Sequence, residues 1–180
     1  MREIKFKGKA MMTNAELDSM HFIHDNGWFV GNLIQNGNKP WIAGDIVESD
    51  PEYIVHDFWV RVNEKSIGQF TGLKDIEQFD KPKELYTGDI VSMHQFLFDG
   101  EEVENEIVGV LDYDEEVAAV CLTKMNNKQI QRYMGYGSDE NGFKQEKIPV
   151  CMFYGLHECS WTYLGNIYEN PELLEGESHV

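Results

Sequence analysis

The chain has 180 residues, of which 42% are hydrophobic and 12% aromatic, a composition that supports one self-folding domain, with or without a smaller lobe. Its 32 acidic and 15 basic residues give a net charge of −17, which argues against direct binding to nucleic acid or to anionic membranes. Every apolar run is far shorter than the ~20 residues of a membrane span, and the start lacks a secretory signal, so we expect a cytoplasmic protein.

The N-terminal part combines short alternating stretches with turn signals. Ile4 and Phe6 lie on one side of an alternating stretch, which indicates a half-buried strand. Thr13 and Glu16 have the spacing of a capping box, which predicts one turn of helix within a loop. Asn36-Gly37-Asn38 is typical of a hairpin turn between two strands. Strands are therefore predicted over residues 2–7, 28–34, 41–42, 53–62 and 66–70.

The C-terminal part predicts a three-stranded meander and two closing strands. Asp99-Gly100 is a turn signal after the first strand of the meander. Residues 127–134 have apolar residues at helical spacing, and Asn170-Pro171 fits the start of a short terminal helical turn. The strands are predicted over residues 90–98, 104–112, 115–123, 148–154 and 161–165.

Short strands at regular spacing favour a small barrel or sandwich over an α/β fold. We therefore predict a mainly β fold with one or two short helices. The tetrapeptide Gly-Asp-Ile-Val occurs at residues 44–47 and 88–91, but the flanking residues differ, so the sequence does not indicate an internal repeat.

Four segments resemble the YopX family in the same order along the chain: MREIKFKGK at the start, GQFTGLKD, YTGDIV and GNIYENPELL. The resemblance spans nearly the whole chain. It implies a single YopX-like unit over residues 1–180, with an N-terminal β lobe over 1–70 and a small SH3-like barrel over 84–174. Family members are encoded by phages and prophages, which implies a bacterial host cell, and the resemblance carries over no enzymatic activity. The chain departs from the pattern in a longer Ile76–Leu85 segment and a long Ala10–Asn26 loop.

The motif residues have an architectural interpretation, because glycine permits unusual backbone angles and Asp or Asn side chains bond turn amides. The predicted structural turn residues are Gly68, Gly72, Asp75, Gly88, Asp89, Gly165, Asn166, Asn170 and Pro171.

The most uneven charge lies in residues 99–116, which hold nine acids and no base. Such a face repels polyanions and favours basic partners. The predicted protein-binding acidic face consists of Glu101, Glu102, Glu104, Glu106, Asp112, Asp114, Glu115 and Glu116.

Signals for other chemistry are weak. His21 with His24, and Cys151 with His157-Glu158-Cys159, lack an established metal spacing, so we predict no metal site. Cys121, Cys151 and Cys159 are expected to be reduced thiols. No hydrolase, NTPase or dehydrogenase signature occurs, so we predict no catalytic residues and no cofactor. The four tryptophans, Trp28, Trp41, Trp59 and Trp161, are compatible with either a ligand groove or core packing.

The leading hypothesis is a non-enzymatic phage or prophage accessory protein that binds an unidentified protein partner, with self-association as a further option. The alternative is an acidic nucleic-acid mimic that occupies a basic host or phage protein through residues 99–116.

Overall fold

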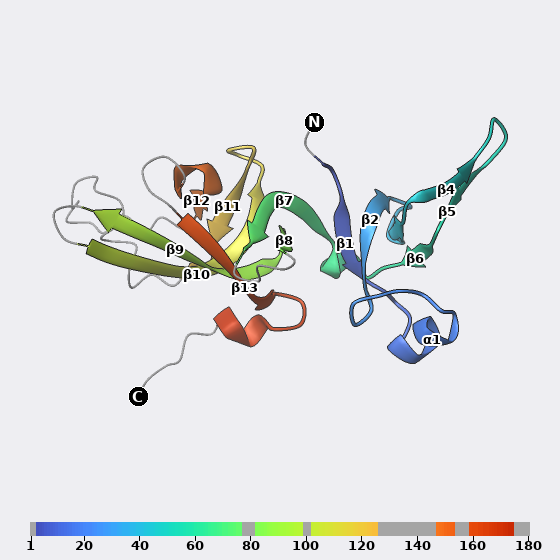
Figure 1. Cartoon of the computed structure of the whole chain (residues 1–180), viewed down its shortest axis with the longest axis horizontal. Helices are drawn as coiled ribbons and strands as arrows, with labels where there is room; N and C mark the ends of the chain where they lie inside the picture. Colours follow the sequence, from blue (N-terminus) through green and yellow to red (C-terminus); the bar gives the residue numbers. More distant parts are fainter. Residues whose placement is uncertain (1–2, 77–81, 99–101, 126–146, 154–158, 175–180) are drawn as a thin grey trace. The chain divides into compact units, whose positions relative to one another are not determined.

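The computed structural model describes residues 3–76, 82–98, 102–125, 147–153 and 159–174. The chain divides into two compact units, Met1–Gly72 and Leu73–Val180. Strands dominate and the helices are short, so the protein is mainly β, with a sheet curled into a half-barrel (Figure 1). No helix in the described ranges combines the length and the apolar character needed to cross a membrane.

The first unit is built on antiparallel strands. Its elements are β1 (Phe6–Lys9), α1 (Asn14–Ser19), β2 (Trp28–Ile34), β3 (Trp41–Ala43), β4 (Ile46–Ser49), β5 (Ile54–His56), β6 (Trp59–Arg61), the 3-10 helix η1 (Glu64–Ser66) and β7 (Gly68–Asp75), which continues past the unit boundary. The main sheet has the order β6-β3-β2-β1-β7, and β4 and β5 form a separate two-stranded sheet (Figure 1).

A small apolar core holds the first unit together. Leu17, Ile42 and Val60 are almost completely buried in one cluster, which Phe29 and Val62 extend. Leu17 reaches this core from α1, whose start is fixed because the Thr13 side chain and the Glu16 side chain each bond the other's backbone amide. The predicted capping box and helical turn are therefore confirmed.

The second unit contains a five-stranded antiparallel sheet. Its elements are β8 (Lys83–Tyr86), β9 (Asp89–Phe98), β10 (Glu102–Asp114), β11 (Ala119–Thr123), β12 (Lys147–Pro149), the 3-10 helix η2 (Val150–Phe153), β13 (Cys159–Asn166) and the 3-10 helix η3 (Pro171–Leu174). The sheet order is β12-β11-β10-β9-β13, and β8 lies next to β7. Its core includes Met93, Leu111, Leu122, Phe153 and Trp161, each less than 5% exposed.

Most predicted elements are confirmed, with shifted ends. The hairpin is present as β2 and β3, and Gly37 between them has the positive φ of +55° that the turn requires. The meander is β9, β10 and β11, the closing strand is β13, and the terminal helical turn is η3 with Pro171 first. The predicted helix over 127–134 and the Asp99-Gly100 turn lie outside the described residues.

Four strand predictions need correction. The first strand begins at Phe6 rather than residue 2, and Ile4 is 67% exposed. The stretch 53–62 is two strands, because its pairing changes from β4 to β3 along the chain. Ser66 belongs to η1, which Asn63 caps, so the next strand starts at Gly68. The strand predicted over 148–154 ends at Pro149, which has no amide proton to continue the ladder.

The two copies of Gly-Asp-Ile-Val have different environments. Ile46 and Val47 are 56% and 61% exposed, whereas Ile90 and Val91 are fully buried in the second unit. The shared tetrapeptide therefore does not mark a repeated structural unit.

Candidate functional site

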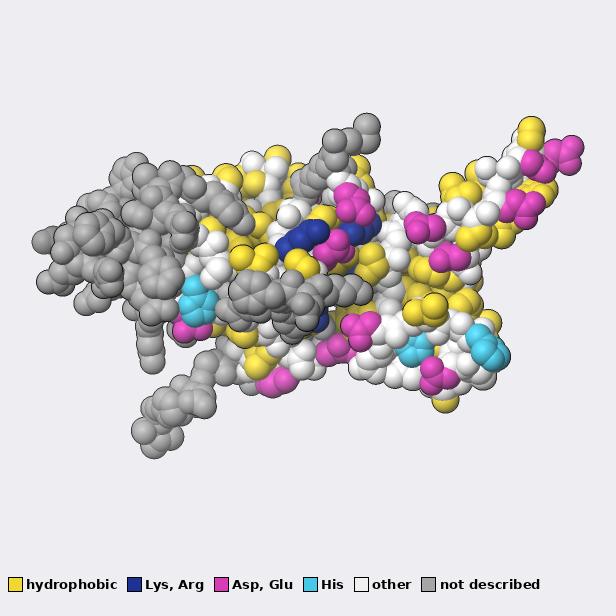
Figure 2. Space-filling model, in the orientation of Figure 1, with side chains coloured by type: hydrophobic (Ala, Val, Ile, Leu, Met, Phe, Trp, Pro, Cys, Tyr) yellow, Lys and Arg dark blue, Asp and Glu magenta, His cyan; other side chains and the backbone are white. Residues whose placement is uncertain are grey.

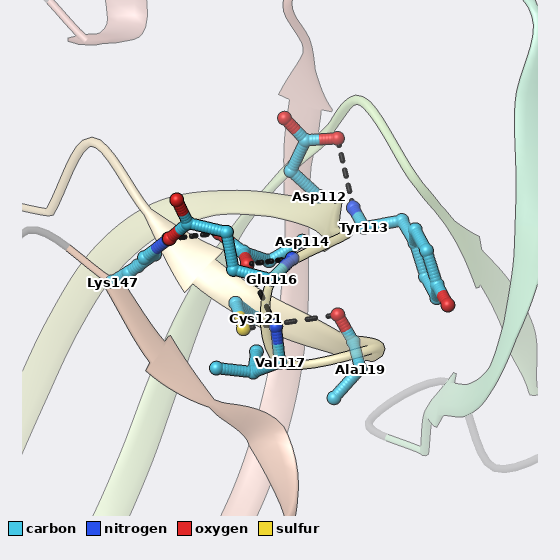
Figure 3. A network of polar contacts seen from close by, with 8 residues as sticks. All are labelled: Asp112, Tyr113, Asp114, Glu116, Val117, Ala119, Cys121 and Lys147. Atoms are coloured by element: carbon cyan, nitrogen blue, oxygen red, sulfur yellow. Dashed lines mark hydrogen bonds and ion pairs between the residues drawn. The ribbon is translucent and has the colours of Figure 1, made fainter.

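The acidic cluster has its best-defined geometry at the turn between β10 and β11, where Lys147 of β12 lies between two carboxylates (Figure 3). The Lys147 Nζ lies 2.5 Å from Asp114 Oδ2 and 2.7 Å from Glu116 Oε2. The other carboxylate oxygen of Asp114 accepts hydrogen bonds from the backbone amides of Glu116 (3.0 Å) and Val117 (3.2 Å). Asp114 therefore organises the turn itself, and it is not simply a solvated charge.

These contacts shift the pKa values of both Asp114 and Lys147. The hydrogen bond from Lys147 lowers the pKa of the Asp114 carboxyl, and backbone amides act in the same direction. The same bond, with help from Glu116, raises the pKa of Lys147. The ion pair thus stabilises the folded state above the ordinary pKa of Asp114 and below that of Lys147, a window of about pH 4 to 10.

We expect Lys147→Met to lower the melting temperature most within that window. As the pH falls through the lowered pKa of Asp114, the carboxyl is protonated in the native protein, and the difference between variant and parent shrinks. Thermal unfolding from pH 2 to 8 measures this. Lys39→Met, at an exposed lysine before β3, is the control. If the difference in melting temperature between Lys147→Met and the parent were the same at every pH, the stabilising role of this ion pair would be contradicted.

Ala118 closes this turn with a φ of +51°, a conformation that costs a residue with a Cβ atom about 1–2 kcal/mol. We expect Ala118→Gly to raise the free energy of unfolding by about 0.5–1 kcal/mol, after allowance for the greater freedom of glycine in the unfolded chain. The matched control is Ala119→Gly, one residue later on β11, which should lower stability because its backbone is an ordinary strand. Urea denaturation distinguishes the two, and a loss of stability for both would contradict the prediction.

The other residues of the predicted acidic face have different environments. Glu115 is exposed in the turn, and exposed Asp112 accepts a hydrogen bond from the Tyr113 amide at 2.8 Å. Glu101 lies outside the described residues, and Glu102 and Glu104 are described only by their backbone positions on β10. The structure therefore brings Asp112, Asp114, Glu115 and Glu116 to one end of the β10–β11 hairpin.

Glu106 lies beside a serine and a histidine that the sequence did not single out. Ser92 Oγ donates to Glu106 Oε1 (2.8 Å) and lies 3.2 Å from His94 Nε2, and the same Nε2 is 3.6 Å from Glu106 Oε1. In a nucleophilic triad, the serine hydroxyl bonds one ring nitrogen of the histidine, and the acid bonds the other ring nitrogen and not the serine. Ser92 is also only 2% exposed. This arrangement suits a polar network between β9 and β10 rather than acyl transfer.

A second polar cluster lies at the corner where β8 turns into β9. Asp89 is fully buried, and its Oδ2 accepts a hydrogen bond from the Tyr86 amide at 2.7 Å. Between them, Gly88 has a φ of +86°. The Gly88 amide donates to the Leu111 carbonyl at 2.7 Å, and its carbonyl accepts from the Ile167 amide at 2.9 Å. This turn is therefore bonded both to β10 and to the segment that follows β13.

Asn166 organises the reversal after β13 in the same corner. It pairs with Asp89 in the ladder between β13 and β9. Its Oδ1 accepts from the amides of Tyr168 (3.0 Å) and Glu169 (2.9 Å), and its carbonyl accepts from the Asn170 amide at 2.8 Å. The chain then enters η3 at Pro171.

Asp75, at the end of β7, bonds the irregular part of β13. Its Oδ2 accepts from the Tyr163 amide at 2.9 Å, where the register against β9 shifts between Tyr163 and Gly165. A Cβ atom on Gly165 would lie 2.7 Å from Asn170 Oδ1 and 2.9 Å from Leu173 Cδ1, so a larger residue here would force these two side chains to move. Lys83 Nζ lies 3.5 Å from the centre of the Tyr163 ring. The carboxylate and amide groups of this corner thus bond backbone amides.

The remaining predicted turn residues belong to β7. Gly68 begins the strand and pairs with Lys7 of β1. Gly72 has a φ of +90°, so this position requires glycine for its backbone angle.

In the comparison with known protein families, the model of the YopX protein family matches residues 32–175, most of the chain. The chain belongs to the YopX protein family. No curated protein and no solved structure gives a significant match. In this YopX protein, the segments GLKD, YTGDI and GNIYENP, which span residues 72–75, 86–90 and 165–171, supply the corner around Asp89 and Asn166.

The residues considered for metal binding have separate environments where the structure describes them. His24 accepts a hydrogen bond from the Gly27 amide on Nδ1 (2.9 Å), and its Nε2 lies 3.3 Å from Asp18 Oδ1, whereas His21 is exposed. His157 and Glu158 lie outside the described residues. Within the described ranges, no group of three or more His, Cys, Asp or Glu side chains could hold a metal ion.

The cysteines and tryptophans differ in environment. Cys121 is buried, which raises the pKa of its thiol, and Cys151 is exposed. Trp161 is core, with its ring edge-on to Phe153 at 5.7 Å between centroids. The other three tryptophans belong to the first unit, and among them Trp59 is 46% exposed and edge-on to His56.

Besides Ser92 and His94, sequence reasoning missed two further features of this protein. Lys147 lies 31 residues from Glu116, and no local pattern indicates their contact. The strand β4 was also missed, although the β-branched pair Ile46-Val47 before the Asp50-Pro51 turn could have indicated the hairpin of β4 and β5.

Proposed function

We propose that this YopX protein is a non-enzymatic phage or prophage accessory protein that acts in the cytoplasm of a bacterial host by binding another protein. The observation that carries the proposal is a group of exposed apolar side chains in the first unit that are interspersed with acids (Figure 2). Exposed apolar patches with polar rims are typical of protein interaction sites. The assignment of residues 84–174 to an SH3-like barrel is part of the same proposal.

The charge of the chain supports a protein partner over other macromolecules. A net charge of −17 repels phosphate backbones and anionic lipid headgroups. The polar groups of the corner around Asp89 and Asn166 bond backbone amides, so this corner supports the fold rather than a reaction.

The test is affinity purification of the intact protein from its host, followed by reconstitution. A tagged chain should recover one host or phage protein in stoichiometric amount. The same protein, purified separately, should bind the untagged chain in isothermal titration calorimetry. Recovery of no protein across several salt concentrations would contradict the proposal.

The alternative function is an acidic nucleic-acid mimic, which the exposed Asp112 and Glu115 beside the ion-paired turn favour. A mimic would bind its basic partner with a steep dependence on salt. Neutralising Glu106, Asp112 and Glu115 together should then weaken binding to the purified partner by at least tenfold. An unchanged affinity would exclude this function and leave the protein-binding proposal in place.

A further inference from the structure

The strands β4 and β5 form an arm, residues 45–57, that extends the pairing of β3 and β6. The Gly44 amide donates to the Phe58 carbonyl at 3.0 Å, and the Asp57 amide donates to the Asp45 carbonyl at 2.9 Å. The ladder then continues from Ile46, opposite His56, to Ser49, opposite Ile54, with a bulge between Ile46 and Glu48. We call residues 45–57 the hairpin arm (Figure 1).

Both faces of the hairpin arm carry exposed apolar side chains. Alternation along β5 places Ile54 on one face and Val55 on the other. Ile54 is 58% exposed and Val55 is 40% exposed, while Val47 at the bulge and Tyr53 at the turn are also exposed. A two-stranded hairpin with no buried face is marginal by itself in water. The apolar side chains of the arm therefore contribute little to the fold of this unit.

Polar contacts hold the hairpin arm in shape instead. Asp50 Oδ1 accepts from the amides of Glu52 (2.7 Å) and Tyr53 (3.1 Å) at the turn. The Tyr53 hydroxyl donates to Glu48 Oε1 at 2.5 Å, and His56 Nδ1 lies 2.7 Å from the Gly44 carbonyl oxygen. Because these contacts already fix the backbone of the arm, the arm loses less conformational entropy on binding than a flexible loop would.

The charge of the hairpin arm selects the kind of partner. Residues 45–57 contain no lysine or arginine, and their acids are Asp45, Glu48, Asp50, Glu52 and Asp57. Apolar and acidic side chains occur together along the arm in Figure 2. In a contact between two arms, a second copy of the chain would bring five more acids, and nucleic acid or an anionic membrane would meet like charge. A protein surface with an apolar cleft and a rim of lysine and arginine is complementary to both the apolar side chains and the acids of the arm.

We propose that the hairpin arm is the element of this YopX protein that inserts into an apolar cleft of a partner protein whose rim carries lysine and arginine. Ile46, Val47 and Ile54 occupy the cleft, and the acids of the arm pair with the basic rim. This inference rests on the proposed protein-binding function and assigns it to a surface other than the acidic face of residues 99–116.

The first step of the test is photo-crosslinking with benzoylphenylalanine at position 54 of the full-length chain, in cells of the natural host. The matched control carries the same residue at position 164, because Leu164 is an apolar side chain on β13 that is 42% exposed. Mass spectrometry identifies the adducts. The inference requires one protein that is crosslinked from position 54 and not from position 164.

The second step measures binding of that purified protein by calorimetry. The double variant Ile46→Ser/Ile54→Ser should weaken it at least tenfold, as loss of central anchor residues does, whereas Leu164→Ser should leave it unchanged. Asp45→Asn/Glu52→Gln should weaken it at low salt and reduce its salt dependence. Because these side chains are exposed, circular dichroism and the melting temperature should match the parent.

Three outcomes would overturn the inference. If the partner binds both hairpin variants as tightly as the parent, the arm is not the site, although the protein-binding function stands. If position 54 crosslinks only to a second copy, and light scattering shows a dimer that the double variant abolishes, the occupant is another chain. If neither crosslinking nor affinity purification yields a partner, the inference and the proposed function both fail.

Discussion

Leu122→Ala is expected to lower the free energy of unfolding by about 2–5 kcal/mol, the range for removing a fully buried leucine from a core. Leu122 is 0% exposed on β11 and belongs to the core cluster that contains Leu111, Ile148 and Phe153. Its side chain also packs on Gly109 of β10, where an added Cβ would lie 2.9 Å from Leu122 Cγ. We expect the surrounding core residues to fill only part of the space that the leucine leaves, so a cavity remains. Urea denaturation followed by tryptophan fluorescence measures the loss.

The same substitution at Leu164 is the control, because that side chain is 42% exposed on β13 of the same sheet. Leu164→Ala should change stability by less than about 0.5 kcal/mol, as surface substitutions usually do. Equal losses for the two variants would mean that Leu122 is not in the core.

Asp89→Ala is expected to cost about 1–3 kcal/mol, because it leaves the buried Tyr86 amide without its carboxylate acceptor. The cost arises inside the corner that also contains Gly88 and Asn166, so the loss should extend to the reversal after β13. Hydrogen exchange of the Tyr86 and Ile167 amides, followed by NMR, would detect faster exchange at both positions.

Two further variants distinguish the role of Asp89 as a hydrogen-bond acceptor from the effect of removing one negative charge on stability. Asp89→Asn keeps the shape and one oxygen acceptor, so it should cost less than Asp89→Ala. Asp112→Ala removes an exposed carboxylate from β10 and should change stability by less than about 0.5 kcal/mol. If Asp112→Ala cost as much as Asp89→Ala, the loss would reflect overall charge and not the buried turn.

Local patterns were sufficient to predict the hairpin of β2 and β3, the meander and the mainly β fold. Alternation of apolar residues and the Asn36-Gly37 turn act over neighbouring residues, so their signals are visible in the sequence. The capping box of α1 was predictable for the same reason, since Thr13 and Glu16 are three residues apart. The ends of strands were less predictable, because Pro149 and Asn63 change the backbone pattern within otherwise β-like stretches.

The long-range features could not be read from the sequence. The ion pairs of Lys147 depend on β12 lying beside β11, a pairing that the chain establishes only in three dimensions. The exposure of Ile46 and Ile54 was also hidden, since an apolar β-branched residue predicts a strand but not whether the strand has a core to cover. The predicted acidic face consequently includes Asp114, whose carboxylate is engaged within the turn.

The sheet order of the second unit has a consequence for how the protein folds. Phe98 of β9 meets Glu102 of β10 across a short connection, whereas Asp89 pairs with Asn166, far along the chain. Closing a long loop costs more entropy and slows assembly, so we expect the meander to form early and β13 to dock late. Until β13 pairs with β9, one edge of β9 has unpaired backbone groups that strands of other molecules can bind. Newly made chains are therefore most prone to aggregate during that interval.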